Sequence, residues 1–158
     1  MKRTFWCLIV LLVFSCKQVE VTDVYNEEPV TAEYPCVSDA LNCLDSINVQ
    51  GGSVNFYSSF SLDSINLVSG AIIVVHGATR NGDDYFNRMI STIKSVGLED
   101  SIMVIAPQFI TEYEKVHDKD WYWNTTSWKW GNQSYMNGSQ SSISSFEIID
   151  YLLSRAAD

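Results

Sequence analysis

The chain has 158 residues, of which 46% are hydrophobic and 18% are charged. This length suits a single domain, and the composition is too apolar for a disordered chain and too charged for a protein with many membrane spans. Ten lysine and arginine residues against 19 aspartate and glutamate residues leave a formal net charge of −9. Because phosphate binding needs a basic patch, no nucleic acid partner is expected. The cysteine and histidine spacing does not fit a zinc site, and neither a metal nor another cofactor is expected.

The N-terminus has the pattern of a signal peptide. A positively charged pair precedes an apolar run at 4–14 that is too short to span a bilayer comfortably. The run leads into residues 13–16 (VFSC), which resemble the lipobox of bacterial lipoproteins, where the cysteine becomes the lipid-carrying N-terminus. The resemblance implies a signal peptide at 1–15, lipidation of Cys16 and export to the envelope, at the outer membrane because Lys17 rather than aspartate comes next. An ordinary signal peptide with a chance cysteine is the alternative.

The predicted segment 16–50 joins an acidic tether to a short loop between two cysteines. Residues 17–33 are polar and acidic without a sustained apolar period, which is typical of a spacer. Cys36 and Cys43 are seven positions apart. Disulfides persist in exported proteins, so we expect a bond between these cysteines, with two free thiols as the alternative.

Residues 51–158 carry the patterns of a folded domain with strands. Alternating apolar residues at 53–62 predict a strand with one buried face. Two continuous, largely β-branched runs, at 71–75 and 102–106, predict strands that are buried on both faces. Such strands are typical of the interior of a parallel sheet.

Two amphipathic helices are predicted in the same domain. Between the two apolar runs, apolar positions repeat at helical spacing from Phe86, with Asn81 as a possible N-cap and Gly97 as a natural end. A strand, helix and strand in this order predict a parallel pair with a right-handed crossover. A last helix is predicted at 144–156, opened by a Ser-x-x-Glu capping box at 144–147.

Residues 107–140 have no clear period and are rich in aromatic side chains. Long irregular loops in compact domains are usually functional. The candidates for substrate binding are Trp121, Trp123, Trp128 and Trp130, because aromatic rings stack on flat apolar faces. Packing of these rings onto the domain is the alternative.

The sequence His76-Gly77-Ala78-Thr79 directly follows the first buried run and precedes a helix. It resembles the α/β-hydrolase family, in which a His-Gly segment follows the third strand, and the resemblance extends over roughly residues 52–158. It implies an α/β fold, namely a partial α/β-hydrolase three-layer sandwich with a mostly parallel sheet, truncated before the nucleophile strand. The last helix would be the one that precedes that strand.

The resemblance also implies roles for residues 76–79 as an oxyanion loop. Backbone N–H groups of Ala78 and Thr79 would stabilise the negative charge that develops on a substrate carbonyl oxygen, while Gly77 lets the backbone approach the substrate closely. His76 would brace the loop. A histidine that is simply packed at the end of a strand, without any role in catalysis, is the alternative.

The rest of the hydrolase machinery is missing from the sequence. It has no Gly-x-Ser-x-Gly elbow, and no nucleophile precedes His117. We therefore expect the N-terminal part of a lipid-anchored serine hydrolase that acts on small or polymeric esters and is inactive as given. The alternative is a non-catalytic surface lipoprotein that holds a glycan or another ligand with its tryptophan-rich loop.

Overall fold

The computed structural model describes residues 34–63 and 68–157. Its elements are η1 (Ala40–Cys43), β1 (Leu44–Val49), β2 (Gly52–Ser58), β3 (Gly70–Ile73), α1 (Gly82–Ser95), β4 (Ile102–Pro107), η3 (Ser127–Trp130) and α2 (Ser145–Arg155). The predicted signal peptide and Cys16 lie outside the described residues, so lipidation and export stay predictions. Within the described ranges, no helix has the length and apolar character needed to cross a membrane.

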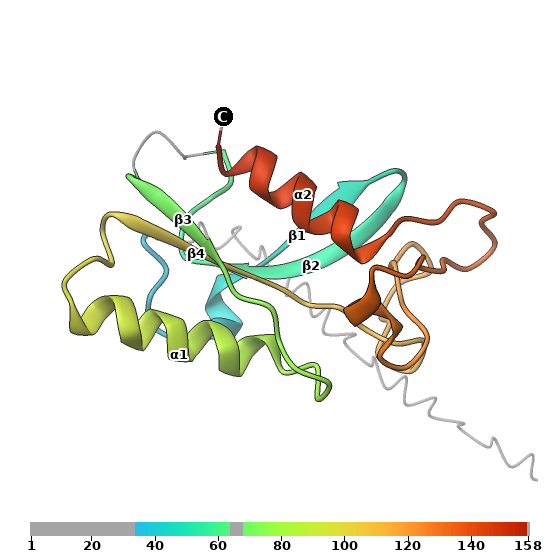
Figure 1. Cartoon of the computed structure of the whole chain (residues 1–158), viewed down its shortest axis with the longest axis horizontal. Helices are drawn as coiled ribbons and strands as arrows, with labels where there is room; N and C mark the ends of the chain where they lie inside the picture. Colours follow the sequence, from blue (N-terminus) through green and yellow to red (C-terminus); the bar gives the residue numbers. More distant parts are fainter. Residues whose placement is uncertain (1–33, 64–67, 158) are drawn as a thin grey trace, which may run out of the picture. The chain divides into compact units, whose positions relative to one another are not determined.

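The four strands form one mixed sheet in the order β1-β2-β4-β3 (Figure 1). β1 runs antiparallel to β2, β2 runs antiparallel to β4, and β3 runs parallel to β4. Two of these three pairs are therefore antiparallel. The predicted partial α/β-hydrolase sandwich with a mostly parallel sheet is wrong for this structure.

The antiparallel part of the sheet depends on β1, a strand that the sequence analysis did not predict. Most residues of β1 are exposed, so no apolar period marks it within the predicted tether and cysteine loop. Gln50 and Gly51 connect β1 to β2 with φ angles of 51° and 87°. Positive φ at both central residues is the signature of a two-residue hairpin turn, which requires antiparallel neighbours.

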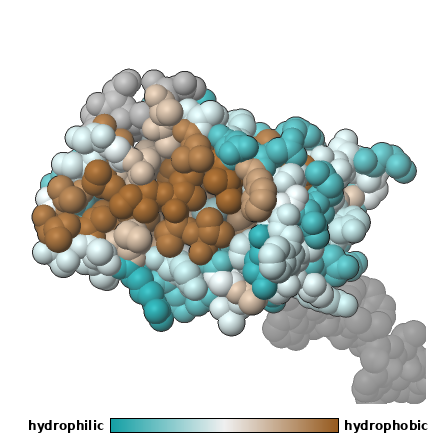
Figure 2. All heavy atoms as spheres, viewed as in Figure 1, coloured by the Kyte–Doolittle hydropathy of each residue, from teal (hydrophilic) through white to brown (hydrophobic). Residues whose placement is uncertain are grey.

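The predicted crossover unit is present as β3, α1 and β4, with Gly70 opposite Ile102 and Ile73 opposite Ile105. β4 is buried along nearly its whole length, as predicted. β3 is only half-buried, because it lies at the edge of the sheet within the described residues. Residues 72–75 are apolar and only partly buried. Figure 2 shows a continuous apolar area on this side of the molecule.

The two helices cover opposite faces of the sheet (Figure 1). Alternate side chains of β4 divide between two cores, since neighbouring residues of a strand point to opposite faces. Met103 and Ile105 pack on the side of α2 and the aromatic loop. Val104 and Ala106 pack on the side of α1 and the Cys36–Cys43 segment.

Residues 34–43 are part of the folded unit. Cys36 and Cys43 are joined by a disulfide, and both are buried in the core next to α1. The backbone N–H of Ala40 donates a hydrogen bond of 3.1 Å to the side chain of Asn87 in α1. The predicted spacer at 17–33 lies outside the described residues, and the cysteine loop that follows it is folded against α1.

Local contacts explain where α1 ends and where α2 begins. In α1, Gly97 has a φ of 69° and, with Leu98, donates to carbonyls of the last turn, which is the Schellman motif. The side chain of Asn81 makes no cap bond, because it contacts Thr79 and Asp84 instead. In α2, both hydrogen bonds of the predicted capping box at 144–147 are formed.

Candidate functional site

A buried histidine links the segments that follow β3 and β4. His76 is only 2% exposed. Its Nε2 atom accepts a hydrogen bond of 3.0 Å from the backbone N–H of Phe109. A backbone N–H can only donate, so Nε2 carries no proton and Nδ1 does. Nδ1 then donates to the carbonyl of Gly77 at 2.9 Å, which makes the ring a neutral imidazole with both nitrogens satisfied.

The imidazole lies in a cluster of aromatic rings. Its edge meets the rings of Trp128 and Phe109 at centroid distances of 4.6 and 5.8 Å. Phe109 stacks on Trp128 at 5.3 Å and meets Trp123 edge-on at 5.0 Å. Burial lowers the pKa of His76 from its ordinary value. The cluster therefore packs three parts of the chain around an uncharged ring. They are η3, the loop after β3 and the segment after β4.

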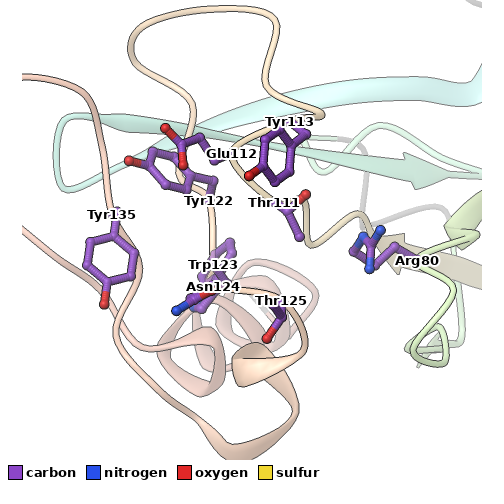
Figure 3. Close-up of a pocket in the computed structure, with 9 residues that line it drawn as sticks. All are labelled: Arg80, Thr111, Glu112, Tyr113, Tyr122, Trp123, Asn124, Thr125 and Tyr135. Carbon is purple, nitrogen blue, oxygen red and sulfur yellow. The ribbon is translucent and has the colours of Figure 1, made fainter.

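An open cleft of about 540 Å³ lies next to this cluster, between the loop after β3 and the long loop after β4. Its walls carry tyrosine, tryptophan, hydroxyl, amide and charged side chains, which face a common space in Figure 3. The lining residues are Arg80, Thr111, Glu112, Tyr113, Tyr122, Trp123, Asn124, Thr125 and Tyr135. Tyr122 and Tyr135 stack on each other, with centroids 5.8 Å apart and planes 29° apart.

An ion pair fixes one end of the cleft. The Nε atom of Arg80 donates to both carboxylate oxygens of Glu114, at 3.0 and 2.7 Å, and its Nη1 donates to the carbonyl of Ala78 at 3.1 Å. Glu114 also accepts hydrogen bonds from the backbone N–H and the hydroxyl of Thr111. Burial raises the pKa of Glu114, but the bonds from Arg80 and Thr111 outweigh burial and hold this pKa below its ordinary value.

Two cleft residues have unusual backbone conformations. Arg80 and Thr125 have φ angles of 56° and 46°. Among the described residues, the one other non-glycine residue with positive φ is Gln50 in the hairpin turn. A left-handed conformation is a genuine outlier for a β-branched residue such as Thr125. Strain of this kind costs about 1–3 kcal/mol per residue and is concentrated at functional sites.

The four tryptophans predicted to bind substrate have different environments. Trp121, Trp123 and Trp128 are at most 5% exposed, whereas Trp130 is 75% exposed. Trp121 donates its indole N–H to the carbonyl of Val49. Trp123 is the one tryptophan among the lining residues. For Trp121 and Trp128, the structure favours the alternative of packing onto the domain.

Sequence reasoning missed the tyrosines of the cleft, together with Arg80 and Thr125. The signal for Tyr113, Tyr122 and Tyr135 was present, since they lie in the same aromatic loop as the tryptophans. A tyrosine keeps a polar end that favours a partly wet surface, while a tryptophan buries a larger apolar area. No pattern in the sequence marks a positive φ at a residue other than glycine.

The predicted oxyanion loop borders the cleft through its neighbour Arg80. Within the described residues, the backbone N–H groups of Gly77, Ala78 and Thr79 donate to no acceptor, and Ala78 and Thr79 are exposed. A Cβ atom at Gly77 would lie 3.1 Å from the hydroxyl of Tyr85, so this position has little room for a side chain. The oxyanion role of this loop stays a prediction.

Other catalytic groups are not assembled in the described ranges. No serine hydroxyl there hydrogen-bonds to a histidine, and His76 uses both nitrogens for backbone groups. No group of three or more histidine, cysteine, aspartate or glutamate side chains in this part of the chain could hold a metal ion. Comparison with models of protein families, with curated proteins and with solved structures finds no match. The hydrolase resemblance therefore stays a prediction from the sequence.

The burial of His76 predicts a pH dependence of stability. The pKa of His76 in the folded state lies below the value of about 6.5 expected in the unfolded chain. As the pH falls below about 6.5, the unfolded state therefore binds the proton first, and the free energy of unfolding decreases until the folded-state pKa is reached. Above about pH 6.5 this contribution is fully present.

Urea unfolding between about pH 7.5 and pH 5 measures this dependence. The variant His76→Gln keeps an acceptor for Phe109 but cannot titrate, so its stability should change less over the same range. The matched control is His117→Gln, which removes an exposed histidine and should behave like the wild-type chain. Equal pH dependence in the wild-type chain and in His76→Gln would contradict a neutral buried imidazole.

Proposed function

We propose that the cleft binds a carbohydrate and that the described part of the chain is a glycan-binding module. The observation that carries this proposal is that two strained backbone conformations occur in one cleft. In the described part of the chain, two non-glycine residues outside the hairpin turn have positive φ, and both of them, Arg80 and Thr125, line the same cleft. Backbone strain of this kind is concentrated at ligand-binding and active sites, so its occurrence at two places in one cleft marks the cleft as a candidate binding site.

The lining residues fit the chemistry of a sugar ring. A pyranose has an apolar face and an equatorial edge of hydroxyls, so it needs an aromatic surface beside polar donors and acceptors. Tyr135 offers aromatic surface, and Asn124 and Thr125 offer an amide and a hydroxyl on the neighbouring wall (Figure 3). The ring of Tyr122 supports Tyr135 by stacking on it, and the ammonium of Lys115 lies 5.4 Å from the Tyr122 centroid. Tyr113 is 95% exposed at the same cleft, where an extended ligand could contact it.

The variant Tyr135→Ala tests this proposal. It removes a half-exposed ring from the cleft, and its backbone pairing with Tyr122 does not need the side chain. Because an aromatic contact contributes on the order of 1 kcal/mol, affinity should fall roughly fivefold. The matched control is Trp130→Ala, which removes an exposed ring of the same loop that does not line the cleft. Its affinity should be unchanged.

The measurement is binding to an array of neutral gluco-, galacto-, manno- and xylo-oligosaccharides, followed by calorimetry on the ligands that bind. Failure of the wild-type chain to bind any oligosaccharide of the array would contradict the proposal. An equal loss of affinity in Tyr135→Ala and Trp130→Ala would also contradict it, because the effect would not then come from the cleft.

The free backbone donors of residues 77–79 favour a second candidate function. In this proposal, the loop stabilises the oxyanion of an ester substrate, and the chain contributes this loop to a serine hydrolase. A serine nucleophile needs a neighbouring base, and the described residues contain no hydrogen-bonded serine and histidine. The nucleophile would therefore lie outside the described residues.

A fluorophosphonate probe tests this second candidate. The 158-residue chain should show no labelled serine within the described ranges and no saturable turnover of p-nitrophenyl acetate that the probe blocks. The same protein isolated from its natural source should carry the label on a serine outside these ranges. Absence of label in the natural protein would refute the hydrolase candidate, and a labelled serine within the described residues would refute the location of its nucleophile.

A further inference from the structure

We infer that Glu114 makes the cleft selective for uncharged sugars, because it neutralises Arg80, the one cationic side chain among the nine lining residues. The inference rests on the proposed function and specifies its ligand class. Among the nine described residues that line the cleft, Arg80 carries the single positive charge and Glu112 the single negative charge. Glu114 adds a second carboxylate directly beside the guanidinium.

The geometry keeps Arg80 engaged with Glu114. Its Nε lies within hydrogen-bond distance of both carboxylate oxygens, at 3.0 and 2.7 Å. Its carbonyl accepts a hydrogen bond of 2.6 Å from the side chain of Gln108, and its Nη1 is bound to the carbonyl of Ala78. The backbone and the head group are therefore both fixed, so the guanidinium cannot leave its partner without breaking several bonds.

Glu114 is held in the ionised form that this role requires. Its Oε2 atom accepts hydrogen bonds from the backbone N–H and the hydroxyl of Thr111, at 2.8 and 2.9 Å. The hydrogen bonds from Arg80 and Thr111 keep the pKa of Glu114 below its ordinary value, despite the opposing effect of burial. At neutral pH the pair is an ionised carboxylate against a guanidinium.

The consequence for ligands follows from the charge balance. The ammonium of Lys115 lies 5.4 Å from the centre of the Tyr122 ring and offsets the charge of Glu112, so the pairing of Arg80 with Glu114 leaves the cleft close to neutral. A ligand carboxylate near Arg80 would meet a guanidinium that is already paired, and Glu114 would repel it. A neutral hydroxyl meets no such repulsion. It can accept a hydrogen bond from Nη2 of Arg80, which has no acceptor among the residues that the structure describes. The cleft should therefore prefer neutral glycans to acidic ones of the same shape.

The variant Glu114→Gln tests this inference. Glutamine keeps an oxygen that can accept a hydrogen bond from Thr111, but it leaves the positive charge of Arg80 without a carboxylate partner. The probes are oligogalacturonides and hyaluronan oligosaccharides, each compared with its neutral methyl-esterified or carboxyl-reduced form, added to the neutral array. Wild-type affinity should favour the neutral form of each bound pair. Glu114→Gln should bind the acidic form roughly tenfold more tightly than wild type, because an Arg–carboxylate bond is charge-assisted.

The matched control is Glu112→Gln, which removes the same charge from the cleft but leaves Arg80 paired. Its gain in affinity for acidic forms should be at most about threefold, as expected for a screened charge without a direct contact. The inference would be overturned if both variants gained equally in affinity for acidic forms. It would also be overturned if the wild type bound acidic and neutral forms with the same affinity. Either result would leave the glycan-binding proposal standing. Absence of binding to every glycan by the wild type and both variants would overturn the two together.

Discussion

The arrangement of the site depends on one buried hydrogen bond, in which the imidazole of His76 accepts the backbone N–H of Phe109. A polar ring can be buried at low cost only if both of its nitrogens are satisfied. His76 meets this condition by also donating to Gly77. The bond fixes the first part of the loop after β3 against the start of the long loop after β4. Arg80 and Thr111, which both donate to Glu114 at one end of the cleft, follow these anchors closely in the chain.

With the anchors fixed, the cleft can hold conformations that a free loop would relax. Arg80 keeps a positive φ while its carbonyl is bound by Gln108 and its side chain by Glu114. Such contacts offset the backbone strain locally. The same ion pair also removes the net charge of the guanidinium from the cleft. In the proposed function, one small set of interactions thus sets both the shape of the cleft and its preference among ligands.

The sequence predicts the elements that have an apolar run or a periodic apolar stripe, but not whether neighbouring strands run parallel or antiparallel. β4, α1 and α2 are found close to their predicted positions because each has an apolar run or stripe. β1 is mostly exposed and depends on pairing with β2, so the antiparallel half of the sheet was missed. For the site, aromatic composition marked the correct loop, but not which rings turn inward. The indoles of Trp121 and Trp128 fill the core, whereas Tyr122 and Tyr135 line the cleft.

The protonation state of His76 at neutral pH tests most directly whether this hydrogen bond organises the site. A long-range proton–nitrogen NMR spectrum distinguishes the two neutral tautomers and the imidazolium, and a scalar coupling across the bond identifies the donor. At about pH 7, the structure requires a neutral ring protonated at Nδ1, with coupling between Nε2 and the amide nitrogen of Phe109. A ring protonated at Nε2, or an imidazolium, would contradict the account.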